Sequence, residues 1–159
     1  MAVAFRLLIA EPHPELQQTV AEVVAAARSL LPLDLEVADA ATPAEVRARV
    51  ATWRPHAVLL DWDIAVDATP RFVDEMCHHT PDLRVLVLLP ASESQYRAAV
   101  WDAGACAGIP RDRMDGEWLA TAVCLVRRAM ERERGLWHRA VARCPVLREL
   151  PQDLEVGAR

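Results

Sequence analysis

Short apolar runs alternate along the chain with longer segments in which apolar residues recur every three or four positions. Continuous apolar runs of four to eight residues are typical of buried strands, and the longer period is typical of amphipathic helices. The runs lie at residues 3–10, 33–38, 57–60 and 83–89, with a weaker one at 106–109. We therefore expect an α/β fold, with a five-stranded parallel sheet and helices on both faces.

The helical segments carry recognisable start signals. Residues 42–53 open with Thr42 as an N-cap, a proline at the first helical position, and Glu45 where a capping box needs an acid. Thr69 and Ser92 stand at the starts of two further segments and predict N-caps there. The five predicted helices are residues 14–30, 42–53, 69–79, 92–104 and 115–134.

The length of 159 residues predicts one domain, at residues 3–134, followed by a C-terminal helical extension and tail at 135–159. An apolar share of 53% and a charged share of 26% are ordinary for a globular protein. The start of the chain does not read as a leader peptide, and the apolar runs are too short to cross a bilayer. We therefore expect a cytoplasmic protein without a membrane partner.

The charge pattern argues against direct binding to nucleic acid. The net charge is −5, and nonspecific binding to nucleic acid depends on Lys and Arg side chains that neutralise phosphates. All eighteen basic residues are arginines, so the chain has no lysine ammonium. Glutamates interrupt the arginine-rich stretch at 127–143, which is interpreted as a solvated face or a protein interface. Four cysteines without CxxC spacing predict free thiols rather than a zinc site.

Charged side chains gather where the predicted strands end. Glu11 follows the first strand, Asp61 and Asp63 follow the third, and Arg111 follows the fifth. Because parallel strands end at one edge of a sheet, these groups should meet there. Carboxylates that converge with one basic group are suited to binding a divalent cation and a phosphoryl group.

Four motifs resemble those of the receiver domain of bacterial two-component response regulators, in the family's order and over roughly residues 5–130. "RLLIAEPHPEL" and "RPHAVLLDWDIA" resemble its first and third strands, and "DLRVLVLLPAS" and "AVWDAGACAGIPRD" resemble its fourth strand and the segment ending at its lysine. The resemblance implies a doubly wound, flavodoxin-like fold with Asp61 as phosphoacceptor. It also implies Mg²⁺ ligands at Glu11 and Asp61, with Asp63 a further candidate, and Arg111 as the phosphoryl contact.

Three residues depart from the family's pattern at positions that serve phosphorylation. Pro12 replaces a second metal-binding acid, Leu89 replaces a hydroxyl donor, and Gly108 replaces the aromatic side chain that moves on activation. Arg111 replaces the lysine and keeps its charge, but a planar guanidinium is not equivalent to an ammonium. We therefore expect Mg²⁺ binding to be weak and phosphorylation-driven switching to be weak or absent.

Two neighbouring residues leave alternatives open. Asp63 either supplies a substitute for the missing acid or merely raises the negative charge around Asp61, and we favour the second interpretation. His13, in "EPHPE", is a candidate base or metal ligand. A His-Pro pair at this point in receivers instead implies that His13 belongs to the first turn of a helix.

The resemblance also implies a surface for partners. Tyr96, Trp101 and Trp118 fall on the predicted fourth and fifth helices, which with the fifth strand form the common partner face of receivers. We expect a homodimer through this face, and contact with a histidine kinase or a downstream regulator.

Together these features predict a non-enzymatic, atypical receiver that acts mainly through protein–protein contacts. A working phosphorelay receiver that accepts a phosphoryl group on Asp61 is one alternative. The N-terminal regulatory domain of a longer DNA-binding transcription regulator is another. An enzyme is disfavoured because the chain has no GxSxG motif, no Ser/His/Asp order and no glycine-rich phosphate loop.

Overall fold

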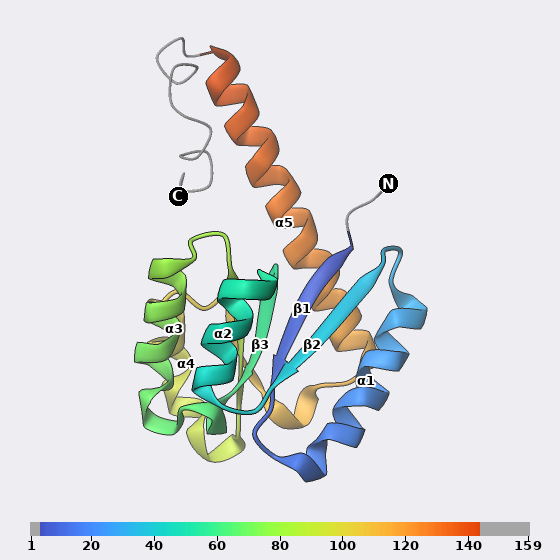
Figure 1. Cartoon of the computed structure of the whole chain (residues 1–159), viewed down its shortest axis with the longest axis vertical. Coiled ribbons are helices and arrows are strands. Elements are labelled where there is room, and N and C mark those ends of the chain that lie inside the picture. The colour runs from blue at the N-terminus through green and yellow to red at the C-terminus, as the bar shows by residue number, and fades with distance from the viewer. Residues whose placement is uncertain (1–3, 144–159) are drawn as a thin grey trace.

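The structure is a computed structural model that describes residues 4–143. Five parallel strands form one sheet in the order β2-β1-β3-β4-β5 (Figure 1). The strands are β1 (Phe5–Ala10), β2 (Leu35–Ala40), β3 (Ala57–Asp61), β4 (Arg84–Leu89) and β5 (Ala107–Pro110). The helices are α1 (Gln17–Leu30), α2 (Pro43–Trp53), α3 (Thr69–His79), α4 (Arg97–Asp102) and α5 (Gly116–Arg143). The predicted doubly wound α/β fold is confirmed, and each predicted strand lies within two residues of its observed bounds.

Each face of the sheet has its own apolar core. Helices α2, α3 and α4 cover one face, and α1 and α5 cover the other (Figure 1). Successive side chains of a strand point to opposite faces, so Leu8 of β1 joins the first core and Leu7 joins the second. Because both faces are covered, β3 and β4 are buried along almost their whole length, which explains their continuous apolar sequences.

Of the three predicted N-caps, one is confirmed and two are wrong. The Thr42 hydroxyl accepts a hydrogen bond from the backbone N–H of Glu45 (3.2 Å), so the predicted cap of α2 is confirmed. Thr69 is not a cap, because its buried hydroxyl donates to the Trp62 carbonyl (3.1 Å). Ser92 is not a cap either: residues 91–96 form 3₁₀ turns, in which Glu93 leaves helical geometry. The predicted fourth helix is therefore reduced to the six residues of α4.

Helix α5 is longer than the sequence predicted. It runs without a break to Arg143, so the expected division at residue 134 falls inside the helix, and residues 144–159 of the expected extension lie outside the described residues. Its first turn packs closely on α1: a Cβ atom at Gly116 would lie 2.5 Å from Cβ of Ala26. Among the helices of residues 4–143, none combines the length and the apolar composition that crossing a bilayer requires.

Candidate functional site

The structure brings together charged residues from three strand ends. Glu11 follows β1, Asp61 is the last residue of β3, and Arg111 follows β5. These strands are parallel, so all three residues lie at the carboxyl edge of the sheet. Glu11 and Asp61 are buried, and the Asp61 side chain is only 1% exposed. A buried carboxylate needs partners, and those partners define the site.

Arg111 pairs with two carboxylates at once. Its Nη2 donates to Oδ1 of Asp61 (2.5 Å) and to Oδ2 of Asp63 (2.8 Å). The guanidinium therefore bridges the two acids that flank Trp62 in "DWD". The Arg111 guanidinium, which the receiver resemblance implied as the phosphoryl contact, is therefore already paired with two carboxylates of the protein.

Asp63 and His13 complete a chain of hydrogen bonds. Oδ2 of Asp63 lies 2.8 Å from Nε2 of His13, and the Asp63 backbone N–H donates to Oδ1 of Asp61 (2.8 Å). Burial opposes ionisation of Asp63, but the hydrogen bonds from His13 and Arg111 outweigh it and hold its pKa below the ordinary value. The same bond to Asp63 raises the pKa of His13. Asp63 thus does more than add negative charge near Asp61: it links His13 to Arg111.

Asp61 has the opposite electrostatic environment. Burial raises its pKa from 3.8 to about 6, although the Asp63 N–H bond and the Arg111 charge act in the other direction. Its Oδ1 accepts both of those bonds, whereas its buried Oδ2 has no hydrogen-bond partner within the described residues. The carboxylate is therefore anchored at one oxygen and unsatisfied at the other.

Three side chains of this site could hold a metal ion. Glu11, His13 and Asp61 each offer a ligand atom, and these atoms lie within 4.8 Å of one another. Asp63, a metal candidate from the sequence, is not part of this trio. His13 takes its place, held by a bond from its backbone N–H to Oε1 of Glu11 (2.9 Å). The receiver resemblance implied that His13 belongs to the first turn of a helix, although its position two residues after Glu11 also makes it a candidate ligand.

Leu89 and Gly108 fit together in the core. Leu89 is fully buried, and a Cβ atom at Gly108 would lie 3.1 Å from Cδ1 of Leu89 and 3.0 Å from Cγ2 of Val100. The two residues that replace the receiver hydroxyl and aromatic are therefore in contact, with the leucine filling space that a side chain at 108 would need. Pro12 lies half-buried between Glu11 and His13.

The three candidate interface residues lie in different environments. Trp101 is 62% exposed on α4. Tyr96 is partly buried, with its ring 4.8 Å from that of Trp62, a residue of the first core. Trp118, in the first turn of α5, is partly buried against the second core. Of the three, Trp101 alone presents a largely free aromatic surface.

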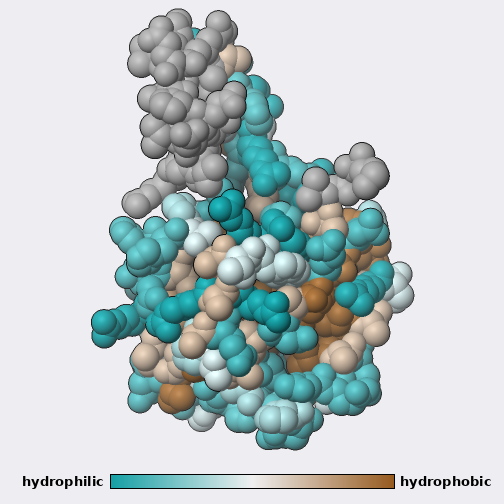
Figure 2. Space-filling model, viewed as in Figure 1, coloured by the Kyte–Doolittle hydropathy of each residue, from teal (hydrophilic) through white to brown (hydrophobic). Residues whose placement is uncertain are grey.

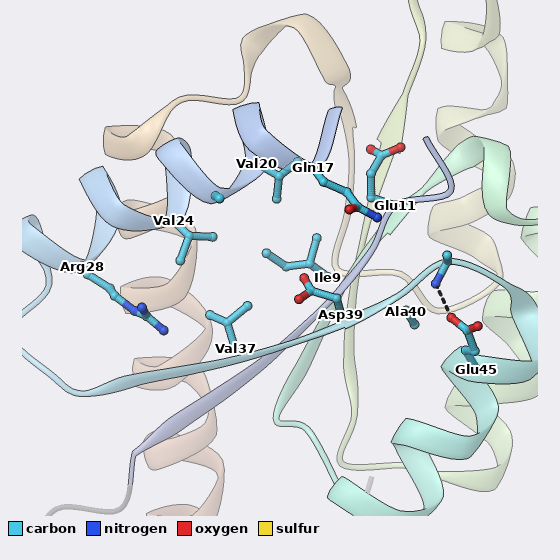
Figure 3. Close-up of a pocket in the computed structure, with 12 residues that line it drawn as sticks. Ile9, Glu11, Gln17, Val20, Val24, Arg28, Val37, Asp39, Ala40 and Glu45 are labelled. Carbon is cyan, nitrogen blue, oxygen red and sulfur yellow. Dashed lines mark hydrogen bonds between the residues drawn. The ribbon is translucent and has the colours of Figure 1, made fainter. Parts of the chain in front are cut away.

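A cavity of about 420 Å³ lies beside the site, between α1, β1 and β2 (Figure 3). Its apolar floor includes Ile9 and Val24, and it coincides with an apolar patch between β2 and α1 on the molecular surface (Figure 2). Arg28 and Asp39 point towards the hollow, whereas the carboxylate of Glu11 points away from it (Figure 3). Glu11 therefore serves the strand-end site rather than this cavity.

Comparison with known proteins identifies the fold. No family model and no curated protein matches the chain. A CheY-like receiver domain protein from Methanospirillum hungatei superposes with a TM-score of 0.67 at 14% identity, covering 82% of this chain and 99% of that one. A receiver domain protein from Clostridium thermocellum gives 0.65 at 16% identity, covering 83% and 98%. NtrX from Brucella abortus gives 0.68 at 17% identity, covering 84% of this chain and 28% of that one. The chain therefore has the fold of the response-regulator receiver domains.

Proposed function

We propose that this protein is an atypical receiver in bacterial signal transduction, acting mainly through protein–protein contacts with little or no phosphorylation-driven switching. The observation that carries the proposal is the double ion pair of Arg111 with Asp61 and Asp63. A phosphoryl group on Asp61 would have to compete with these carboxylates for the one guanidinium of the site. Ion pairs that are partly shielded from solvent are costly to rearrange.

The packing around the switch positions supports the same proposal. Leu89 has no hydroxyl that could donate to a phosphoryl oxygen, and Gly108 has no side chain that could move. A Cβ atom at 108 would lie 3.0 to 3.2 Å from Val100, Leu89 and Arg97, so a side chain there would have to displace its neighbours. A phosphorylated Asp61 would therefore lack both a stabilising donor and an element that reports its presence.

Incubation with Mg²⁺ and acetyl phosphate tests the proposal. We expect the unmodified chain to remain the main species by intact-mass spectrometry, because the site lacks the second acid, the hydroxyl and the lysine. A receiver that autophosphorylates under the same conditions serves as the positive control. A mass gain of one phosphoryl group that disappears in Asp61→Asn would contradict the proposal and favour the phosphorelay alternative.

Exposed apolar residues support a second copy of this chain as a partner. Trp101 on α4 is joined by Leu125 (67% exposed) and Leu136 (60% exposed) on α5. Leu125 and Leu136 are eleven positions apart, which is about three helical turns, so they lie on one side of α5. Leu136 lines the same hollow as Trp101. The α4–β5–α5 face thus carries an apolar strip suited to a homodimer.

Substitution of Trp101 tests this face. We expect Trp101→Arg to weaken dimerisation about tenfold or more, since aromatic anchors contribute most of the energy of an interface. Size-exclusion chromatography with light scattering, over a range of concentrations, measures the effect. Leu30→Arg is the matched control, because Leu30 is also exposed and apolar but ends α1. A monomeric wild-type chain, or equal effects of both variants, would contradict the assignment of this face.

A regulatory domain of a longer DNA-binding regulator is the second candidate. It is favoured by the match to NtrX, where this fold accounts for 28% of a longer chain. In a regulator of this kind, the DNA-binding output domain would lie outside the described residues. Sequencing the complete reading frame separates this candidate from a receiver that acts alone.

A further inference from the structure

We propose that Glu11, His13 and Asp61 form a binding site for a divalent first-row transition ion, and that the imidazole of His13 makes this site prefer such an ion to Mg²⁺. The inference goes beyond the proposed function and does not depend on whether Asp61 accepts a phosphoryl group. It concerns the ion that the site selects.

The three side chains are placed for joint ligation. Their ligand atoms lie within 4.8 Å of one another, and they come from the end of β1, the turn that follows it and the end of β3. Ligands at about 2.1 Å from an octahedral ion are separated by about 3.0 Å when adjacent and about 4.2 Å when opposite. Shifts of about 1 Å at the side-chain tips would therefore bring the three ligand atoms to these separations.

The unsatisfied oxygen of Asp61 is an independent sign of a ligand. Oδ2 is buried in a side chain that is 1% exposed, and it has no hydrogen-bond partner among residues 4–143. A buried carboxylate oxygen without a partner costs free energy that a bound cation would recover. Because Arg111 contacts Oδ1, an ion at Oδ2 need not displace it. The guanidinium and the ion would thus occupy different oxygens of one carboxylate.

The charges of the site match a divalent ion. Three carboxylates (Glu11, Asp61 and Asp63) face the single guanidinium of Arg111, so with a neutral His13 the ionised site retains two negative charges. A 2+ ion would neutralise this excess. Nε2 of His13 donates to Asp63 (2.8 Å), so the ring keeps this bond if it ligates through Nδ1, the arrangement in which a carboxylate orients a metal-ligating histidine.

The donor set determines which ion fits. Mg²⁺ selects oxygen ligands in near-ideal octahedral geometry and keeps several waters. An imidazole suits Fe, Ni, Cu and Zn, whereas carboxylate, carbonyl and water ligands suit Mg. Pro12 stands where the receiver pattern has an oxygen ligand, so the chain has lost a magnesium ligand and placed a nitrogen ligand next to it.

Titration calorimetry with the metal chlorides alone tests the proposal on the whole chain. We expect Co²⁺ to bind at least tenfold more tightly than Mg²⁺. His13→Ala should weaken Co²⁺ binding by about tenfold to a hundredfold and leave Mg²⁺ binding almost unchanged. His13→Asp should reduce the preference for Co²⁺ over Mg²⁺, because it restores an oxygen ligand. The visible absorption of bound Co²⁺ gives a second readout of the loss of the imidazole.

His138→Ala is the matched control, because His138 lies on the far part of α5, away from the strand ends, with its Nδ1 2.7 Å from the Arg134 carbonyl oxygen. It should leave Co²⁺ binding unchanged. Equal affinities for Co²⁺ and Mg²⁺ in the wild-type chain would overturn the proposal, as would a Co²⁺ affinity that survives His13→Ala. Either result leaves the phosphorylation test unaffected, so the two proposals fail separately.

Discussion

Asp61→Asn is expected to raise the free energy of unfolding by about 2 to 3 kcal/mol at pH 8, in the absence of metal. Burial raises the pKa of Asp61 from 3.8 to about 6, and that value already includes the attraction of Arg111. The folded protein therefore pays to ionise this carboxyl group. Asparagine has the same shape, keeps an oxygen that accepts the Asp63 N–H, and does not ionise.

The effect must depend on pH with a definite sign. A carboxyl group whose pKa is higher in the folded state favours folding while it is protonated in both states, below about pH 4. That contribution is lost as the pH rises from about 4 through 6, because the unfolded chain releases the proton first. The stabilisation by Asp61→Asn should therefore be small at pH 4 and reach its full value above pH 7.

Urea unfolding at pH 4, 6 and 8, in the presence of a chelator, measures this dependence. Asp63→Asn is the matched control, because His13 and Arg111 lower the pKa of Asp63. It should destabilise the protein at pH 8, the opposite sign to Asp61→Asn. A destabilising Asp61→Asn at pH 8, or an effect that does not vary with pH, would contradict the electrostatic account of the site.

The second large effect is expected at Leu89 and Gly108, which replace the hydroxyl donor and the aromatic side chain of the receiver pattern. Leu89→Ala should cost about 2 to 5 kcal/mol, because it removes a fully buried side chain from the first core. Gly108→Ala should cost about 1 to 3 kcal/mol, since the new Cβ would lie 3.0 to 3.2 Å from Val100, Leu89 and Arg97. In the double variant the cost should fall below the sum by about 0.5 kcal/mol or more, because removal of Leu89 Cδ1 makes room at 108.

Chemical denaturation of the four proteins in this double-mutant cycle gives the coupling energy. Leu60→Ala combined with Gly108→Ala is the control pair, since Leu60 lies in the same core but on β3, which β4 separates from β5. Strict additivity for Leu89 and Gly108 would show that the leucine does not fill the space beside the glycine. Leu89 and Gly108 would then not act together to block the switch.

The fold could be predicted because its signals are local. Each strand is a short apolar run, and parallel strands with both faces covered leave little ambiguity in β3 and β4. The meeting of Glu11, Asp61 and Arg111 followed from the same logic, since the carboxyl ends of parallel strands share one edge. Nothing beyond residue order was needed to place these three side chains near one another.

The roles of His13 and Asp63 could not be predicted in the same way. Their hydrogen bond joins residues fifty positions apart and depends on side-chain directions that no period in the sequence encodes. Thr69 was misread for a similar reason: its hydroxyl bonds to the Trp62 carbonyl across a loop instead of capping its own helix. The length of α5 was underestimated: the predicted end at residue 134 lies inside the helix, and Gly135 continues it.

The length of α5 sets the orientation of its far end. Its 28 residues extend for about 42 Å, whereas strands of at most six residues span about 20 Å, so the last turns of the helix stand clear of the sheet (Figure 1). Every residue between the anchored first turn and Leu136 contributes about 100° of rotation and 1.5 Å of rise. One residue inserted between Met130, a core residue of α5, and Leu136 would turn the far leucine to another side of the molecule without disturbing the core. The number of residues in α5 therefore determines the side of the molecule to which Leu136 points.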